Sequence, residues 1–166
     1  MYQDRLNEKH QILAEVFGDV DRDVLVVLKG HLLIEESLNN IIENFIYHPD
    51  KLKNANLSFY QKIHIAKSMS IAQENNTMWQ LIEKLNSLRN DFAHNLTSDK
   101  RNHKIQDIRK LYEDEVKGSA FENDWYSNDL ATFISLIVSF CLGFLTSFEV
   151  EVEKKRSLMK ILNRAL

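Results

Sequence analysis

The segment LRNDFAH at residues 88–94 combines an arginine, an asparagine and a histidine, residue types that can bind an anion and transfer a proton. An imidazole exchanges protons near neutral pH, and a guanidinium binds phosphate through its planar set of N–H groups. If this segment is helical, Asn90 and His94 lie one turn apart on the same face, so the Asn90 amide can orient the imidazole. Arg89 is rotated by about 140° from His94 and reaches the same phosphate only through its long side chain. We therefore expect Arg89, Asn90 and His94 to form a catalytic group.

A pair of carboxylates, Glu35 and Glu36, lies in the middle of an earlier, long helical pattern. Such a helix buries one face, so one of the two is expected to point inward, where a carboxylate needs a partner such as Arg89 or a backbone N–H. Because the sequence does not show which of the two points inward, Glu35 and Glu36 are both predicted to support the site formed by Arg89, Asn90 and His94. A solvated helix face is the alternative interpretation of the same pair.

A local run of positive charge follows the segment at Lys100, Arg101, His103 and Lys104. The net charge of the chain is −3, so any contact with RNA has to be local, and this run is the predicted place for it. The alternative is an ordinary solvated helix face on which nearby aspartates complement the basic residues.

Several common kinds of catalytic and metal site are absent from the sequence. It has no HExxH, no pair of CxxC motifs, no glycine-rich phosphate loop and no GxSxG. These absences argue against a metalloprotease, a zinc ribbon, a P-loop protein and a hydrolase with a nucleophile elbow. The six histidines are scattered without the spacing of metal ligands. We therefore expect neither a metal site nor a cofactor.

The spacing Arg89-x4-His94 matches the R-x4-6-H signature of the HEPN superfamily (higher eukaryotes and prokaryotes nucleotide-binding), and the chain resembles this family. Asn90 is the polar residue that the family favours after the arginine, and a small residue, Ala93, precedes the histidine. The order of the preceding segments is also similar, with Glu35-Glu36 in a long helix and a helix start at residues 57–63. The resemblance covers roughly residues 22–150, and its specific part is RNDFAH.

The resemblance implies an all-α bundle and a metal-independent ribonuclease of a stress, toxin or phage-defence type. It also implies a homodimer, because a two-fold axis would bring two histidines and two arginines around one scissile phosphate. The expected products are a 2′,3′-cyclic phosphate and a 5′-OH. The expected partners are RNA, a second copy of the chain, and an antitoxin or regulatory protein.

Two features of the sequence qualify the resemblance. Arg5 and His10 also have the R-x4-H spacing, but Leu6 follows the arginine and the setting is different. Family toxins that are paired with a nucleotidyltransferase antitoxin usually carry a tyrosine two residues after the histidine, and Leu96 stands there in this chain. Control by modification of that tyrosine is therefore not expected.

A non-catalytic function is the alternative for the whole chain. Arg89 would then pair with Glu35 or Glu36, Asn90 would end the helix, and His94 would be a surface or a satisfied core histidine. The protein would be a helical regulator or adaptor, resembling the mannitol-operon repressor type, that acts through protein or nucleic-acid contacts.

The pattern of apolar residues predicts the helices that must position these groups. One proline and four glycines in 166 residues leave few breaks, which favours an all-α fold of about five to six helices in a single domain. We expect an N-terminal helix in residues 1–20, a HEPN-like core in 21–150 and a helical extension in 151–166. Asp21, Ser58 and Thr77 are expected to cap helices, and Gly118 is expected to end one.

The stretch from residue 130 to 148 has no charge and has the length of a bilayer span. Small residues recur along it every three or four positions, a surface that suits close packing against other helices. We expect a buried core helix, with a membrane segment as the weaker alternative. The N-terminus lacks a secretory signal, and the one cysteine, Cys141, lies in an apolar run, so we expect a cytoplasmic protein that does not associate with membranes.

Overall fold

The computed structural model describes residues 21–70, 76–95, 100–119, 121–122 and 129–164. These residues form six helices and no strand, which confirms the predicted all-α, single-domain bundle. The helices are α2 (Arg22–Phe45), α3 (Pro49–Lys53), α4 (Phe59–Met69), α5 (Thr77–His94), α6 (Arg101–Val116) and α7 (Leu130–Arg164). The expected N-terminal helix in residues 1–20 lies outside the described residues.

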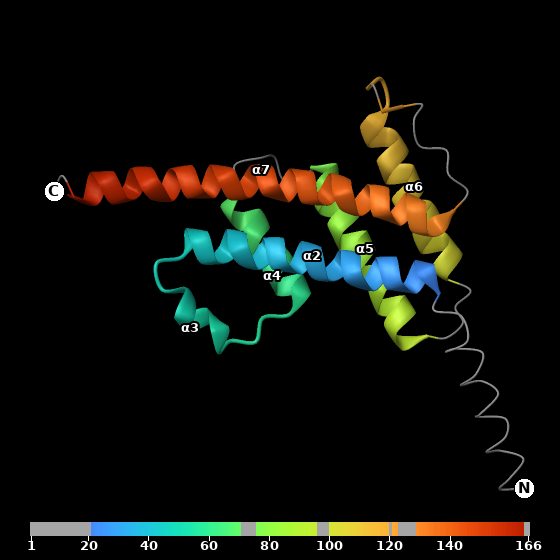
Figure 1. The fold of residues 1–166 in the computed structure, drawn as a ribbon, viewed down its shortest axis with the longest axis horizontal. Coiled ribbons are helices and arrows are strands. Elements are labelled where there is room, and N and C mark those ends of the chain that lie inside the picture. Colours follow the sequence, from blue (N-terminus) through green and yellow to red (C-terminus); the bar gives the residue numbers. More distant parts are fainter. Residues whose placement is uncertain (1–20, 71–75, 96–99, 120, 123–128, 165–166) are drawn as a thin grey trace, which may run out of the picture.

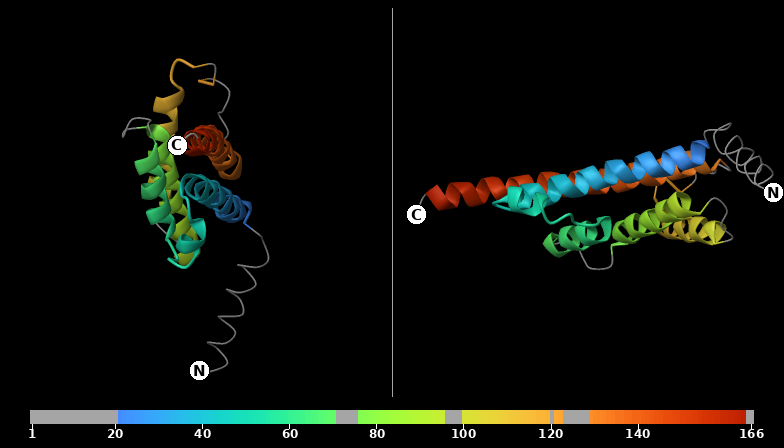
Figure 2. Two further views of the ribbon diagram at one scale, coloured as in Figure 1. Left: turned by 90° about the vertical axis from the view of Figure 1, so that its left-hand side faces the viewer. Right: turned by 90° about the horizontal axis from the view of Figure 1, so that it is seen from below.

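The helices lie in two layers (Figures 1 and 2). The long helices α2 and α7 run side by side in the same direction and form one layer. Arg22 pairs with Asp129 at 3.2 Å where both helices begin, and Arg156 Nη1 lies 3.4 Å from Asn44 Oδ1 near the end of α2. Helices α4, α5 and α6 form the second layer, which crosses this pair on one side (Figure 2).

The core lies between these layers and is continuous through the bundle. Trp79 is almost completely buried and meets the rings of Phe144 and Phe148 edge-on, so the start of α5 is packed on α7. Gly30 allows α2 to approach α7 closely, because a Cβ atom there would lie 2.6 Å from Val138 Cγ2. The pairing of the two long helices therefore depends on a missing side chain.

The small residues of α7 lie on the outside of the bundle, contrary to the packing expected from the sequence. The exposed positions are Thr132, Ser135, Ser139, Gly143 and Thr146. The buried face of the same helix is apolar instead and includes Ile134, Ile137, Cys141 and Leu145. Spacing predicted which small residues share a face, but it did not predict that this face would be solvated.

Helix α7 continues without a break from Leu130 to Arg164, across the position where we expected the core to give way to an extension. Its final turns project beyond the end of α2 (Figure 1). The segment Leu130–Leu162 is long and apolar enough to span a membrane, with a mean hydropathy of 2.0 in its most apolar window, 39% of which is buried in the bundle.

Local signals explain most helix starts. Asp21 accepts the backbone N–H of Asp23, and Ser58 forms a reciprocal capping box with Gln61, so both expected caps are present. The expected cap of α5 was displaced by one residue: Asn76 accepts the N–H of Met78, and Thr77 is the first helical residue.

Helix α3 was not expected, because Pro49 at its start is a residue type that usually interrupts a helix. Proline instead occupies the first turn of this short helix, where its missing N–H removes no intrahelical bond. At the end of α6, Gly118 has a φ of 76° and follows the C-cap residue Lys117, as expected for a residue that ends a helix.

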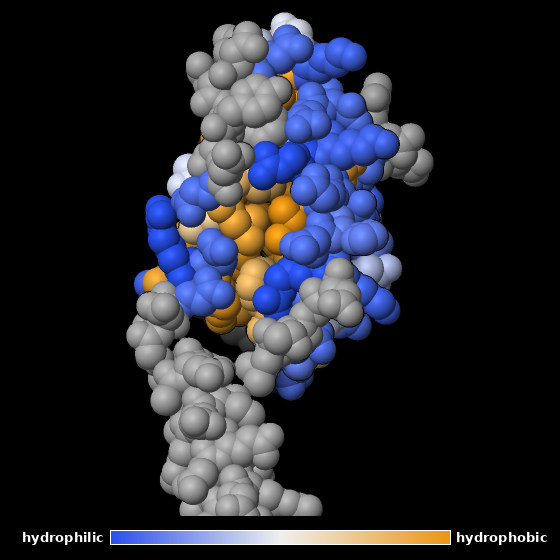
Figure 3. Space-filling view, turned by 90° about the vertical axis from the view of Figure 1, so that its right-hand side faces the viewer, coloured by the Kyte–Doolittle hydropathy of each residue, from blue (hydrophilic) through white to orange (hydrophobic). Residues whose placement is uncertain are grey.

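Apolar and hydrophilic residues lie side by side on the surface of the bundle at the end where α2 and α7 begin. Figure 3 shows an apolar area there, framed by hydrophilic side chains on both sides. Leu25, near the start of α2, is 39% exposed. The C-terminal end of α5, which carries the RNDFAH segment, lies toward the same end of the molecule (Figure 1).

Candidate active site

The RNDFAH segment forms the last two turns of α5 and divides between two environments. Asn90 and His94 are exposed, Arg89 is half-buried, and Asp91 is only 5% exposed. Arg89 Nη1 donates to Asn90 Oδ1 at 3.1 Å. No hydrogen bond joins Asn90 to His94 in the described part of the chain, so Asn90 contacts the arginine and not the imidazole that we expected it to orient.

Asp91 is buried because it continues the apolar face of α5. It lies three residues after Leu88 and six after Leu85, both of which are buried, so helical spacing places its carboxylate on the inner face. A buried carboxylate needs partners, and Asp91 receives the Nε of Arg101 at 3.1 Å and the side-chain amide of Asn95 at 3.1 Å.

The basic run of α6 therefore divides into two groups. Arg101 is bonded to Asp91, and Lys104 lies 3.7 Å from the same carboxylate and donates to the carbonyl of Ser87 at 3.1 Å. Lys100 and His103 are exposed. Two of the four predicted RNA contacts thus make internal contacts that join α6 to the end of α5.

Sequence reasoning missed this function of Asp91, although the signal was present. The spacing of Leu85, Leu88 and Asp91 predicts a buried carboxylate, and the basic residues that follow are its nearest partners in the sequence. We had considered those basic residues only as contacts to RNA or as a solvated face.

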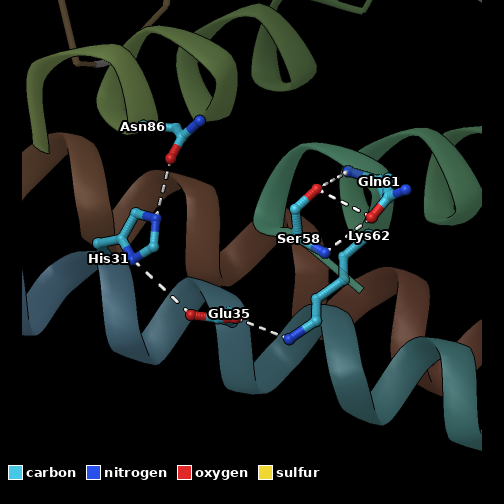
Figure 4. Close-up of polar contacts among 6 residues, drawn as sticks. All are labelled: His31, Glu35, Ser58, Gln61, Lys62 and Asn86. Carbon is cyan, nitrogen blue, oxygen red and sulfur yellow. Dashed lines mark hydrogen bonds and ion pairs between the residues drawn. The ribbon is translucent and has the colours of Figure 1, made fainter. Parts of the chain in front are cut away.

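A second polar cluster lies where α2, α4 and α5 meet (Figure 4). His31 is 5% exposed, and its ring lies 4.0 Å from the ring of Phe59. Its Nε2 donates to Asn86 Oδ1 at 3.1 Å, and its Nδ1 faces Glu35 Oε2 at 3.9 Å, beyond hydrogen-bond range. The ring is therefore held between α4 and α5 by one hydrogen bond and one ring contact.

Burial lowers the pKa of His31 below its ordinary value of 6.5, because a charged ring would lose its contact with water. The hydrogen bond to Asn86 and the nearby charge of Glu35 act against this shift, and the positive charges of Arg89 and Lys62 add to it. The charge of Arg89 in the motif therefore acts on His31, although the two residues belong to different helices.

Glu35 is the carboxylate of the predicted pair that turns inward. Its partner is Lys62 on α4, whose Nζ lies 2.7 Å from Glu35 Oε1 (Figure 4). Glu36 is exposed. Neither glutamate pairs with Arg89 in the described residues, so the arginine is not neutralised in the way that the non-catalytic interpretation expected.

A cavity of about 400 Å³ lies between α2, α3 and the start of α4, away from the motif. Its polar lining residues are Asn39, Glu43, Asn56 and Lys62. The cavity shares Lys62 with the His31 cluster, but none of its lining residues belongs to RNDFAH. The end of α5 is therefore not part of this hollow.

Within the described residues, Cys141 and the metal-ligating side-chain types are further candidates for a site. Burial raises the pKa of the Cys141 thiol to about 12, so this side chain is protonated at neutral pH. In the part of the chain that the structure describes, no three His, Cys, Asp or Glu side chains are grouped so that they could hold a metal ion.

No protein-family model, curated protein or solved structure that was compared with the chain matches it. The likeness to the HEPN superfamily therefore depends on the residues of the motif and on the order of the helices around it.

Proposed function

We propose that the protein is a metal-independent endoribonuclease of the HEPN type, active as a homodimer, in which Arg89 and His94 are catalytic and Asn90 supports Arg89. The observation that carries the proposal is the arrangement at the end of α5. Arg89, Asn90 and His94 are accessible to solvent, and the residue between them, Asp91, is buried and anchors the turn. A stress, toxin or phage-defence context belongs to the same proposal.

The reaction needs two proton transfers. One His94 takes the proton of the RNA 2′-OH as its oxygen attacks the adjacent phosphorus. The His94 of the second copy, in its protonated form, gives a proton to the leaving 5′ oxygen, which leaves a 2′,3′-cyclic phosphate and a 5′-OH. The Arg89 guanidinium stabilises the charge on the phosphate oxygens, and its bond to Asn90 limits the directions in which it can point.

Two features support the pairing of copies and the binding of RNA. The apolar area at the end of the bundle lies toward the same end as His94, so a second copy that covers this area would bring two motifs near one another (Figures 1 and 3). Lys100, directly before α6, and His103, in its first turn, are exposed and close in the chain to the motif, and they can contact the phosphate backbone.

Cleavage of a mixed RNA pool in EDTA tests the proposal, because EDTA removes contaminating metal-dependent nucleases. We expect wild type to cleave and to leave cyclic-phosphate ends, and we expect His94→Ala to lose at least about a hundredfold in rate, the usual contribution of a general acid or base. His10→Ala is the matched control, because it removes the histidine of the other R-x4-H spacing, and it should retain activity. Equal cleavage by all three proteins, or none by wild type, would contradict the proposal.

A non-catalytic adaptor is the second candidate, and two observations favour it. Arg101 and Lys104 are engaged within the chain, which weakens the predicted RNA surface. The projecting end of α7 exposes Leu158, Ile161 and Leu162 by 61–64%, which suits a contact with a regulatory protein. An adaptor would bind its partner equally well with His94→Ala, and the same variant would separate the two candidates.

A further inference from the structure

The Arg101 guanidinium forms hydrogen bonds to two residues in the last turn of α5. Arg101 donates from Nε to Asp91 Oδ2 at 3.1 Å and from Nη2 to the carbonyl oxygen of Asn95 at 2.8 Å. Asp91 accepts the side-chain amide of Asn95 at 3.1 Å and, through its carbonyl, the backbone N–H of Asn95 at 2.9 Å. These bonds close a ring through the three residues, and His94 lies on the turn that the ring spans.

The same guanidinium covers the residue on the other side of the turn. The Cζ atom of Arg101 lies 4.1 Å from the centre of the Phe92 ring, in a cation–π arrangement. Arg101 thus touches Asp91, Phe92 and Asn95, and the two residues between these contacts are Ala93 and His94. We call the set Asp91, Asn95 and Arg101 the clasp.

We propose that the clasp positions His94: Asp91 and Arg101 hold the helical turn that carries the imidazole in one orientation toward the substrate. This inference rests on the proposed function, because it assigns these residues to the same reaction. It also replaces the predicted role of Arg101 as an RNA contact with a role inside the chain.

The clasp lies at the end of a helix, where the last turn is held by fewer hydrogen bonds than the turns before it. The last carbonyl groups of a helix have no intrahelical partner, so the final turn opens readily and its side chains sample several directions. A displacement of about 1 Å in a reacting group can reduce a rate by about a hundredfold. A buried carboxylate paired with a guanidinium resists such opening, because separating them removes the nearest positive charge from the buried Asp91 carboxylate.

The chain offers a matched control on the same two helices. Lys84 on α5 and Asp107 on α6 form an ion pair at 2.6 Å, and both are exposed. Asp107→Asn therefore removes one α5–α6 ion pair without touching the turn of His94, whereas Asp91→Asn removes the centre of the clasp. Arg101→Lys is the second test variant, because an ammonium keeps the charge but cannot bond Asp91 and Asn95 in the fixed geometry of a guanidinium.

The test measures amide hydrogen exchange at residues 93–95 and the imidazole signals of His94 by NMR, followed by kcat and KM on RNA in EDTA. We expect Asp91→Asn and Arg101→Lys to speed exchange at residues 93–95 by about tenfold or more, as the loss of one or two hydrogen bonds predicts. The His94 signals should move toward those of an unstructured peptide, kcat should fall, and KM should stay within about twofold. Asp107→Asn should change none of these quantities.

Three results would overturn the inference. A rise in KM with unchanged kcat and exchange in Arg101→Lys would make Arg101 an RNA contact. Faster exchange along all of α5 and α6 in both clasp variants would make the clasp a general support of the fold. Unchanged His94 signals in both variants would remove the positioning role. If wild type does not cleave RNA, the proposed function fails, and the exchange and imidazole signals still decide whether the clasp holds His94.

Discussion

His31 is buried and His94 is exposed, so water reaches only the His94 ring freely. The two imidazoles therefore differ in how easily each can carry a charge. His94 is exposed at the end of α5, where a substrate can meet it. His31 is enclosed between α2, α4 and α5, stacks on Phe59 and donates to Asn86. A charged His31 ring would lose hydration, so the folded protein favours the neutral form.

This preference predicts how stability depends on pH. Because the pKa of His31 is lower in the folded than in the unfolded chain, its contribution is fully present above the unfolded pKa of about 6.5 and is lost as pH falls below it. The free energy of unfolding should therefore decrease from pH 7.5 to 5.5, with a share from this one proton no steeper than about 1.4 kcal/mol per pH unit.

Urea denaturation across this pH range measures the effect. His31→Gln retains a donor for Asn86 and removes the titration, so its stability should vary less with pH than that of wild type. His64→Gln is the control, because His64 is exposed, and it should behave as wild type does. Equal pH dependence in all three proteins would show that His31 protonates without opposing the fold.

Single residues also show where sequence reasoning reaches its limit. The pattern predicted that RNDFAH lies on a helix, because apolar spacing along one helix is a local property. It did not find the His31–Asn86 bond or the Glu35–Lys62 pair, because these partners are 55 and 27 residues apart. Only the crossing of α2 with α4 and α5 brings them together, and spacing within one helix carries no information about that crossing.

At the level of helices, two glycines differ in the space around them: Gly30 is crowded by a neighbouring side chain, and Gly143 is not. A Cβ atom at Gly30 of α2 would lie 2.6 Å from Val138 Cγ2 and 3.3 Å from its Cγ1. A Cβ atom at Gly143 of α7 would meet nothing within 4 Å. The first glycine sets the separation of the two long helices, and the second only lowers the helix propensity of α7.

Alanine substitutions should therefore act in opposite directions. Gly30→Ala should lower the free energy of unfolding by about 1–3 kcal/mol, because the branched Val138 side chain has little freedom to move aside. Gly143→Ala should raise it by up to about 1 kcal/mol. Urea denaturation of both variants measures the two effects.

A double variant checks the cause. Gly30→Ala combined with Val138→Ala should lose less stability than the sum of the two single variants, because the second substitution removes the atoms that the new Cβ meets. Additive losses would show that the strain at Gly30 has another origin.

The helices themselves were largely predictable, because each start is encoded within a few residues. Asp21 and Ser58 cap their helices as expected, and Gly118 follows the end of α6. Helix α3 was missed because a proline is compatible with both a break and a first helical turn. The face of α7 that is buried was also not predicted, because small residues suit a helix contact and a solvated face equally.

Over the whole molecule, the uncharged half of α7 is the feature that could change where the protein resides. Its apolar residues are packed against α2 and the second layer, and its exposed side carries small polar residues such as Ser135, Ser139 and Thr146. A helix that faced lipid would have an apolar outer face instead. We therefore propose that the protein is cytoplasmic and that this helix is the core of a soluble bundle.

Fractionation without detergent tests this proposal. The full chain should remain in the supernatant after high-speed centrifugation of a lysate and should not bind vesicles. As a control for burial, Cys141→Asp places a charge in the core and should send the chain to the aggregated fraction, because an unpaired buried carboxylate destabilises the bundle. Wild type that enters the soluble fraction only with detergent would indicate a membrane protein.

The projecting end of α7 also offers a place where the protein can be attached to a solid surface. The 35 residues of this helix span about 50 Å at the standard helical rise, and its last turns extend past the end of α2 (Figure 1). The end of α5 that carries His94 lies toward the opposite end of the bundle. A surface tether attached after Arg164 would thus use the protein's own helix as a rigid spacer and leave the motif facing the bulk solution.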